Sequence, residues 1–125
     1  MDNARGRNFE NLRIWTEARF FVNEVYRMMV VCRDYGFRDQ IQRAAISIMN
    51  NIAEGFECGS DAKFINFLNI SKGSCAEVKS MLYLCQDFEY CTEEKRIQMQ
   101  KQLESITNGI WNLIAYLKNN NQTKQ

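Results

Sequence analysis

Four polar side chains in one short stretch, RAAISIMNNIAEG (residues 43–55), have the spacing of a single helical face. Their separations are four, four and three residues, which places them in a line beside an apolar stripe on an α-helix. The four are Arg43, Ser47, Asn51 and Glu54. They differ from the mixture of Lys and Glu that is typical of a solvated face. With Ser74 and Glu77 of a later segment, we predict an interhelical polar network that fixes helix register or a subunit contact. A ligand or RNA site at the same place is the alternative.

Catalytic chemistry has few groups to draw on, because the chain contains no His, the side chain most often used for proton transfer. This excludes helical ribonucleases that pair Arg with His, and di-iron bundles that need Glu-x-x-His on two helices. Glu54 and Glu57 match one half of the acidic set of helical nucleotide pyrophosphohydrolases, but Glu77 stands alone on the next helix. We predict a non-enzymatic protein without a cofactor. The alternative is a small-ligand or Mg-dependent nucleotide-handling enzyme that uses the acidic residues of helices 2 and 3 together with Arg43.

The five cysteines form no C-x-x-C pair, and without His they match no usual zinc spacing. An odd number of cysteines also makes a disulfide framework a poor explanation, and reduced thiols are typical of a cytosolic protein. The first residues contain no apolar signal region, and no apolar run approaches the length of a membrane span. We therefore expect a cytoplasmic protein with no metal site and no membrane partner.

Nucleic-acid binding is a possible role for the arginines of the first predicted helix, which are Arg13, Arg19, Arg27 and Arg33. The competing interpretation is a solvated face, because Glu10, Glu17 and Glu24 are interleaved with them at pairing distance. The chain carries 16 basic and 15 acidic side chains, a net charge of +1. That balance argues against a surface built throughout for phosphate backbones. Any basic patch must be assembled by folding or by oligomerisation.

Apolar residues repeat at steps of three and four and predict four helices, over about residues 11–33, 38–57, 62–89 and 92–118. Ser60 or Asp61 is expected to cap the third helix and Thr92 the fourth. Short connections make successive helices antiparallel neighbours. The fold class is therefore all-α, an antiparallel up-down-up-down four-helix bundle. Residues 1–125 form one domain, with about 9–118 ordered and 1–8 and 119–125 flexible. Gly73, in the middle of the third helix, predicts a close backbone approach, because a helical Gly costs about 1 kcal/mol relative to Ala.

The first helix carries two apolar lines. One line contains residues such as Ala18, Val25 and Met29, and the second contains Ile14, Phe21 and Met28 at steps of seven. One face is enough for a monomeric bundle, so a second face favours a subunit contact, since large exposed apolar patches are uncommon on monomers. The alternative is a helix buried more deeply than average.

Three motifs together resemble those of the large-subunit ribosomal RNA intervening-sequence proteins, a family of small bacterial four-helix bundles. The matching residues are Phe9, Leu12, Ile14 and Trp15, then Gln40 to Gly55, then Phe64 to Glu77. The chain departs from the family pattern at Met49, where Pro is frequent, and at Cys58, where a basic residue is common. The resemblance implies a homopentamer of four-helix bundles and brings no established enzymatic activity. A related group, the accessory proteins of diversity-generating retroelements, forms basic pentameric barrels that bind nucleic acid, and a net charge of +1 sets this chain apart from them.

The expected function is that of a homo-oligomeric helical scaffold whose partner is RNA or an RNA-handling protein. An oligomer repeats each surface charge around its symmetry axis, so a modest net charge per chain is compatible with a concentrated charge in the assembly.

Overall fold

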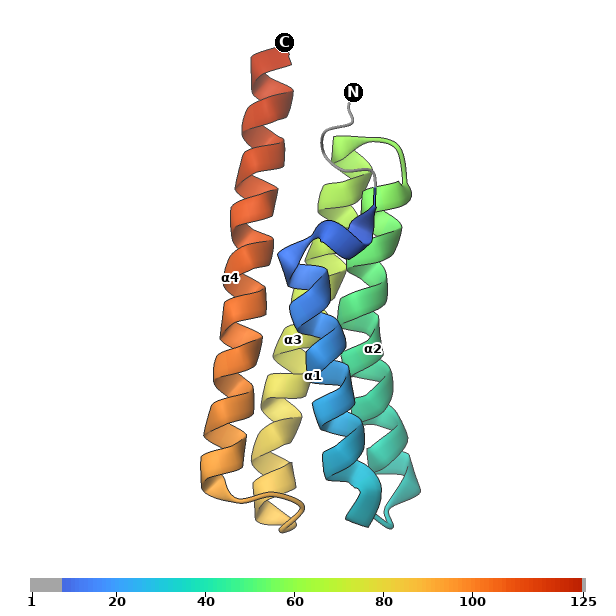
Figure 1. Ribbon diagram of the computed structural model, residues 1–125, viewed down its shortest axis with the longest axis vertical. Coiled ribbons are helices and arrows are strands. Elements are labelled where there is room, and N and C mark those ends of the chain that lie inside the picture. Colours follow the sequence, from blue (N-terminus) through green and yellow to red (C-terminus); the bar gives the residue numbers. More distant parts are fainter. Residues whose placement is uncertain (1–7, 125) are drawn as a thin grey trace.

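The computed structural model describes residues 8–124, and every regular element in that range is helical. In chain order these are η2 (Phe9–Asn11), α1 (Arg13–Met28), η3 (Met29–Val31), α2 (Tyr35–Glu57), α3 (Asp61–Asp87) and α4 (Glu93–Lys124). In Figure 1 α1 and α3 run downward and α2 and α4 run upward around a common core, and α4 extends several turns beyond the start of α1. The predicted all-α four-helix fold is confirmed.

Side-chain caps set the beginnings of three helices. The side-chain oxygens of Asp34, Ser60 and Thr92 each accept a hydrogen bond from the backbone N–H three residues later, at 3.1, 3.2 and 3.1 Å. Such a cap satisfies one of the N–H groups that the first turn leaves unpaired. The predicted caps at Ser60 and Thr92 are confirmed. Asp34 starts α2 three residues earlier than the apolar pattern indicated.

Two predicted boundaries differ from the structure. The helix expected over residues 11–33 is an α-helix only from Arg13 to Met28, because tighter 3-10 turns flank it on both sides. The helix expected to end near residue 118 continues to Lys124, whereas the sequence analysis placed residues 119–125 in a flexible tail. Residues 1–7, predicted to be flexible, lie outside the described residues.

The core contains both apolar lines of α1. Ile14, Phe21 and Met28 are buried within this single chain, with Phe21 fully inaccessible. They alternate with Ala18 and Val25 at steps of four and three to form one continuous core seam. The prediction that Ile14, Phe21 and Met28 form a separate subunit-contact face is therefore wrong. The two apolar lines predicted from the sequence are therefore parts of one buried face of α1. Ile14, Phe21 and Met28 are every second residue of that face, which is why they recur at steps of seven.

The closest helix approaches occur at Gly55 and Gly109. A Cβ on Gly55 would lie 2.7 Å from a ring carbon of Phe64, and a Cβ on Gly109 would lie within van der Waals overlap of Ile14 Cγ2. Gly73 has no neighbouring atom within 4 Å of such a Cβ. The predicted backbone approach at Gly73 is wrong, since this glycine faces outward on α3.

Candidate functional site

The contact between α2 and α3 is made by small polar side chains. Ser74 Oγ donates to Ser47 Oγ at 2.9 Å, and Asn51 Nδ2 donates to the same hydroxyl at 2.9 Å and to Ser47 O at 2.8 Å. Ser71, which is fully buried, donates from Oγ to Ile48 O at 2.8 Å. Each hydroxyl therefore has a partner, as buried polar groups require. Ser71 is a member of this contact that was not among the six residues predicted from the sequence.

The predicted network does not extend to its charged members. Arg43 and Glu54 are exposed, and the structure gives neither a hydrogen bond nor an ion pair within residues 8–124. Glu77 Oε2 accepts a hydrogen bond from Gln40 Nε2 at 3.2 Å, which joins α2 to α3 two turns away from Ser47. Of the six predicted residues, the structure brings Ser47, Asn51 and Ser74 together. The charged side chains lie further round the helix surface, where water solvates them.

The carboxylates of the alternative enzyme site do not converge. Glu54 and Glu57 are exposed near the end of α2, whereas Glu77 lies beside Gln40, near its beginning. Fourteen residues of helix separate Gln40 from Glu54, a distance of about 20 Å at 1.5 Å per residue. Within the described part of the chain, no three His, Cys, Asp or Glu residues lie close enough together to hold a metal ion. Glu54, Glu57 and Glu77 therefore do not form a common site in the described part of the chain.

The arginines of the first helix are mostly engaged on the surface of the bundle. Arg13 pairs with Glu17, and Arg27 Nη1 lies 3.2 Å from a carboxylate oxygen of Glu24. Arg19 packs over the ring of Trp15, at 5.9 Å from the guanidinium carbon to the ring centre. Arg33 is exposed in the connection between α1 and α2. The pairing matches the solvated-face interpretation at two of the four positions.

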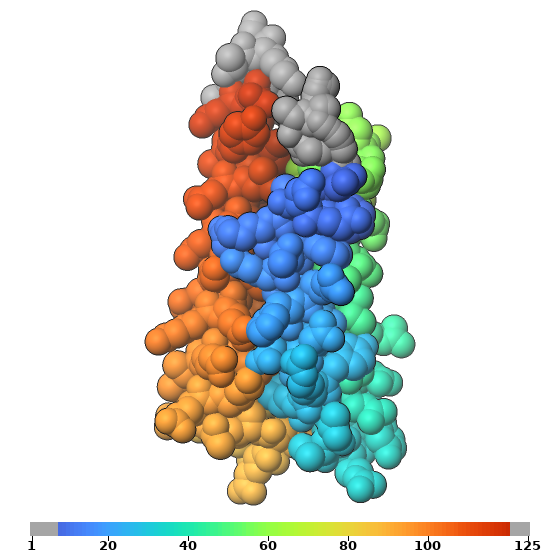
Figure 2. Space-filling view, in the orientation of Figure 1, coloured from blue at the N-terminus to red at the C-terminus, as the bar shows by residue number. Residues whose placement is uncertain are grey.

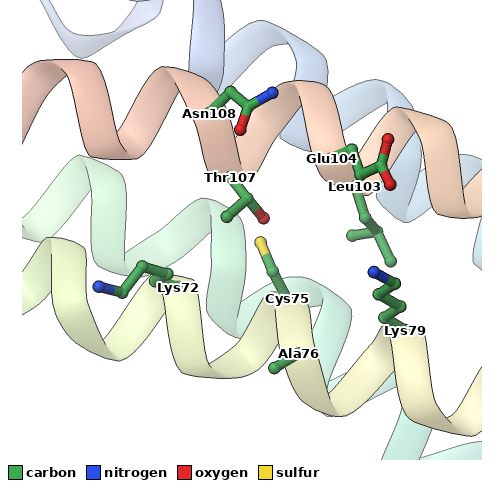
Figure 3. Close-up of a pocket in the computed structure, with 8 residues that line it drawn as sticks. All are labelled: Lys72, Cys75, Ala76, Lys79, Leu103, Glu104, Thr107 and Asn108. Carbon is green, nitrogen blue, oxygen red and sulfur yellow. The ribbon is translucent and has the colours of Figure 1, made fainter.

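A cleft of about 230 Å³ opens between α3 and α4. Figure 3 shows two lysines that line it from α3 and three polar side chains that line it from α4. They are Lys72 and Lys79 opposite Glu104, Thr107 and Asn108. Leu103 and Ala76 complete its walls.

Cys75 forms part of the cleft floor. Burial raises the pKa of the Cys75 thiol to about 11, although a hydrogen bond with Thr107 acts in the opposite direction. Burial also raises the pKa of the Cys85 thiol to about 12. Both thiols are therefore protonated at neutral pH, and a protonated thiol is a poor nucleophile. Both cysteines are free and buried.

Two exposed aromatic rings border the α3–α4 seam, and each is held by a cation. Lys72 Nζ lies 3.3 Å from the centre of the Trp111 ring, and the Arg96 guanidinium carbon lies 4.7 Å from the centre of the Tyr83 ring. Trp111 is 52% exposed and Tyr83 is 51% exposed. The sequence analysis missed these residues as a group. The sequence did contain one indication of their exposure, because Trp111 and Tyr83 fall outside the apolar positions that repeat at steps of three and four along their helices.

Arg96 is fixed by several polar partners. Its Nη1 donates to Gln100 Oε1 at 2.7 Å, and Gln100 Nε2 donates across the seam to Lys79 O at 3.1 Å. Its Nε donates to Gln86 Oε1. This network is the α3–α4 counterpart of the serine contacts between α2 and α3, built from longer side chains. It holds Arg96 against Tyr83.

No helix within residues 8–124 has the length and apolar character needed to cross a membrane.

Comparisons with known proteins identify the fold and the family. The chain is similar in structure to a crystallised protein of the S23 ribosomal protein family from Bacteroides thetaiotaomicron, with a TM-score of 0.74 and 27% sequence identity over 81% of this chain and 97% of that one. The comparison with curated proteins found no match. Residues 10–112, which include three of the four long helices and most of α4, match the 23S rRNA-intervening sequence protein family. The chain belongs to the family of 23S rRNA-intervening sequence proteins.

Proposed function

We propose that this protein is a non-enzymatic scaffold that assembles as a homo-oligomer and holds RNA or an RNA-handling protein. Polar atoms of Ser47, Ser71, Ser74 and Gln100 are used in helix–helix contacts. The thiols of Cys75 and Cys85 on α3 are buried and protonated. Other molecules would therefore bind to the surface of the bundle and not in its interior. The resemblance to the intervening-sequence proteins supports a pentamer as the form of the oligomer.

The observation that carries the proposal is an exposed apolar patch at one end of the bundle. The connections between α1 and α2 and between α3 and α4 lie side by side at this end (Figures 1 and 2). The loop-end patch consists of Val30, Val31, Tyr35, Leu84 and Phe88, of which Val30 is 76% exposed and Val31 63%. Exposed apolar side chains that gather at one place on a soluble protein mark an interaction surface. Since Ile14, Phe21 and Met28 are unavailable, we assign the subunit contact to this patch.

The mass of the protein in solution tests the assembly. We expect light scattering on a size-exclusion peak to give a multiple of 14.7 kDa, which for five copies is about 74 kDa. The double substitution Val30→Asp, Val31→Asp should lower that mass, because charges buried in an apolar contact lose their hydration. Ile70→Asp is the matched control, since Ile70 is 53% exposed but lies midway along α3. A wild-type mass of 14.7 kDa would contradict the proposal.

A magnesium titration separates the scaffold from the alternative enzyme. A ligand that binds only the folded state raises the melting temperature. We expect millimolar magnesium to leave the melting temperature unchanged, because Glu54, Glu57 and Glu77 do not meet. A saturable rise that disappears in Glu54→Gln would favour the enzyme.

A further inference from the structure

The seam between α3 and α4 combines exposed aromatic rings with unpaired cations along one edge of the bundle. Lys79 follows Lys72 by seven residues on α3, and Lys118 follows Trp111 by seven residues on α4. Seven residues are two helical turns, so each pair lies on the same edge of its helix. Within the described residues, neither Lys79 nor Lys118 has an ion-pair partner.

We propose that this seam binds single-stranded nucleic acid, with bases stacked on Trp111 and Tyr83 and phosphates held by Lys79 and Lys118. The inference rests on the proposed function, because it names RNA as the partner that the scaffold holds. Single-strand sites combine a cationic track with aromatic side chains on which successive bases stack. Both kinds of group are present on this seam.

The rings are held in place before any ligand arrives. Lys72 occupies one face of Trp111 and Arg96 occupies one face of Tyr83. About half of each side chain remains exposed. A ring that is already fixed loses little conformational entropy when a base stacks on it. The cation–π contacts therefore give these two aromatic residues a role that an ordinary exposed ring lacks.

The length of the seam fits a short single strand. Eleven residues of α3 separate Lys72, which marks the position of Trp111, from Tyr83. This corresponds to about 16 Å along the helix axis. This spacing of the two rings suits the lower end of single-strand site sizes, about four nucleotides, and Lys118 lies about 10 Å beyond Trp111 along α4. An oligomer would repeat the track once per subunit.

Glu104 is the one carboxylate among the eight residues that line the α3–α4 cleft. In Figure 3 it lies on α4 beside Leu103, nearer to Lys79 than to Lys72. A phosphate approaching Lys79 is repelled by this carboxylate, so the surface binds an anion less strongly than its lysines alone would. Removing the charge of Glu104 should therefore strengthen binding, whereas the substitutions of Trp111 and Lys79 should weaken it.

The experiment is a fluorescence-anisotropy titration of the full chain with labelled ten-nucleotide oligouridylate and oligoadenylate at 50 and 200 mM salt. We expect Trp111→Leu to weaken binding about tenfold, because stacking on one aromatic ring contributes about 1–3 kcal/mol per base. Trp111→Phe should restore most of the affinity, since Phe keeps a stacking face. Lys79→Gln should reduce the slope of log affinity against log salt by about 0.7.

Two substitutions and a duplex complete the test. Glu104→Gln should tighten binding about two- to threefold by removing the repulsion, and Arg33→Gln, on the exposed connection after α1, should leave binding unchanged. A duplex of the same sequence should bind more weakly, because its bases are not free to stack. Thermal melts of every variant exclude misfolding as the cause of a loss.

The outcomes separate this inference from the scaffold proposal. No binding at 50 mM salt, or equal binding by wild type and Trp111→Leu, overturns the seam as a nucleic-acid surface. A loss in Arg33→Gln with none in Lys79→Gln also overturns it and points to the connection between α1 and α2. None of these results changes the solution mass, which alone decides whether the chain assembles.

Discussion

On one side α3 packs against α2 through small side chains, and on the other it packs against α4 through long ones. In the α2 contact, Ser71 Oγ donates to Ile48 O and Ser74 Oγ donates to Ser47 Oγ. The α4 contact uses the long side chains of Arg96 and Gln100, which reach across to Gln86 and to the backbone of Lys79 on α3. Small side chains let two helix backbones come close and leave little room for anything else.

The α2–α3 seam and the α3–α4 seam therefore have different roles in the bundle. A close contact with every hydroxyl paired admits one register, because a shift along the helix leaves buried hydroxyls without partners. The α3–α4 seam leaves a cleft of about 230 Å³ and two exposed rings at the surface. The first seam therefore specifies the fold, and the second has side chains available to a ligand.

The largest expected effect tests how close the α2–α3 seam is. A Cβ on Gly55 would lie 2.7 Å from Phe64 Cδ1 and 2.8 Å from Phe67 Cβ, so Gly55→Val should lower the free energy of unfolding by about 3 kcal/mol. The matched control is Gly73→Val, which meets no atom within 4 Å and should change it by less than about 0.5 kcal/mol. Urea denaturation measures both. Similar losses in the two variants would contradict the difference between a close seam and an open helix face.

The next effect concerns the floor of the α3–α4 cleft. The ordinary pKa of the Cys75 thiol, 9.0, applies to the unfolded chain, and burial raises the pKa to about 11 in the folded state. The folded state therefore favours the protonated thiol, and this contribution is fully present below pH 9 and lost as the pH rises through 11. The loss is on the order of 2–3 kcal/mol.

Denaturation midpoints between pH 8 and pH 11 measure this loss. Stability should fall over that interval and fall less steeply in Cys75→Ala. Cys58→Ala is the control, because Cys58 lies in the connection between α2 and α3. If Cys75→Ala and wild type show the same pH dependence, burial does not raise the pKa of the Cys75 thiol. Water would then reach this thiol at the floor of the α3–α4 cleft.

The two connections of α3 also differ, and the difference predicts a gain in stability. Gly59, before α3, has φ +93°, and Glu89, after α3, has φ +64°. Glu89 occupies the left-handed position of a Schellman motif, in which Tyr90 N–H donates to Cys85 O at 2.8 Å and Glu89 N–H to Gln86 O at 3.0 Å. Such a φ strains a side chain with a Cβ but not glycine.

Glu89→Gly should therefore raise the free energy of unfolding by about 0.5–1 kcal/mol, whereas Gly59→Ala should lower it by about 1 kcal/mol. Thermal melts of the two single variants give both signs. A destabilising Glu89→Gly would show that the Glu89 side chain makes a stabilising contact that outweighs its strained backbone.

The fold was predictable from the sequence because it depends on periodicity and caps, which are local. The heptad-like apolar seams and the caps at Ser60 and Thr92 each follow from residues a few positions apart. The assignment of Ile14, Phe21 and Met28 failed because a periodic pattern does not indicate how many neighbours surround a helix. In this bundle α2 and α4 flank α1 and cover both lines.

The site was less predictable, because its contacts join residues that are distant in the sequence. Ser74 meets Ser47 across 27 residues, and Lys72 meets Trp111 across 39. The polar line from Arg43 to Glu54 was visible as a helical face, but its rotation relative to α3 depends on the packing of the whole bundle. That rotation places Ser47 and Asn51 in the seam and leaves the charged residues outside it.

The smallest expected effect sharpens this last distinction. Arg43→Ala should change the free energy of unfolding by less than about 0.3 kcal/mol, because the exposed guanidinium has no partner within residues 8–124. Ser74→Ala should cost about 1 kcal/mol, since it removes the hydroxyl that donates to Ser47. Both are measured by urea denaturation at several protein concentrations. A loss of about 3 kcal/mol in Arg43→Ala would mean that Arg43 pairs with a buried carboxylate. The polar network between α2 and α3 would then include charged residues. A loss that appears only in the assembled protein would instead place Arg43 in a subunit contact.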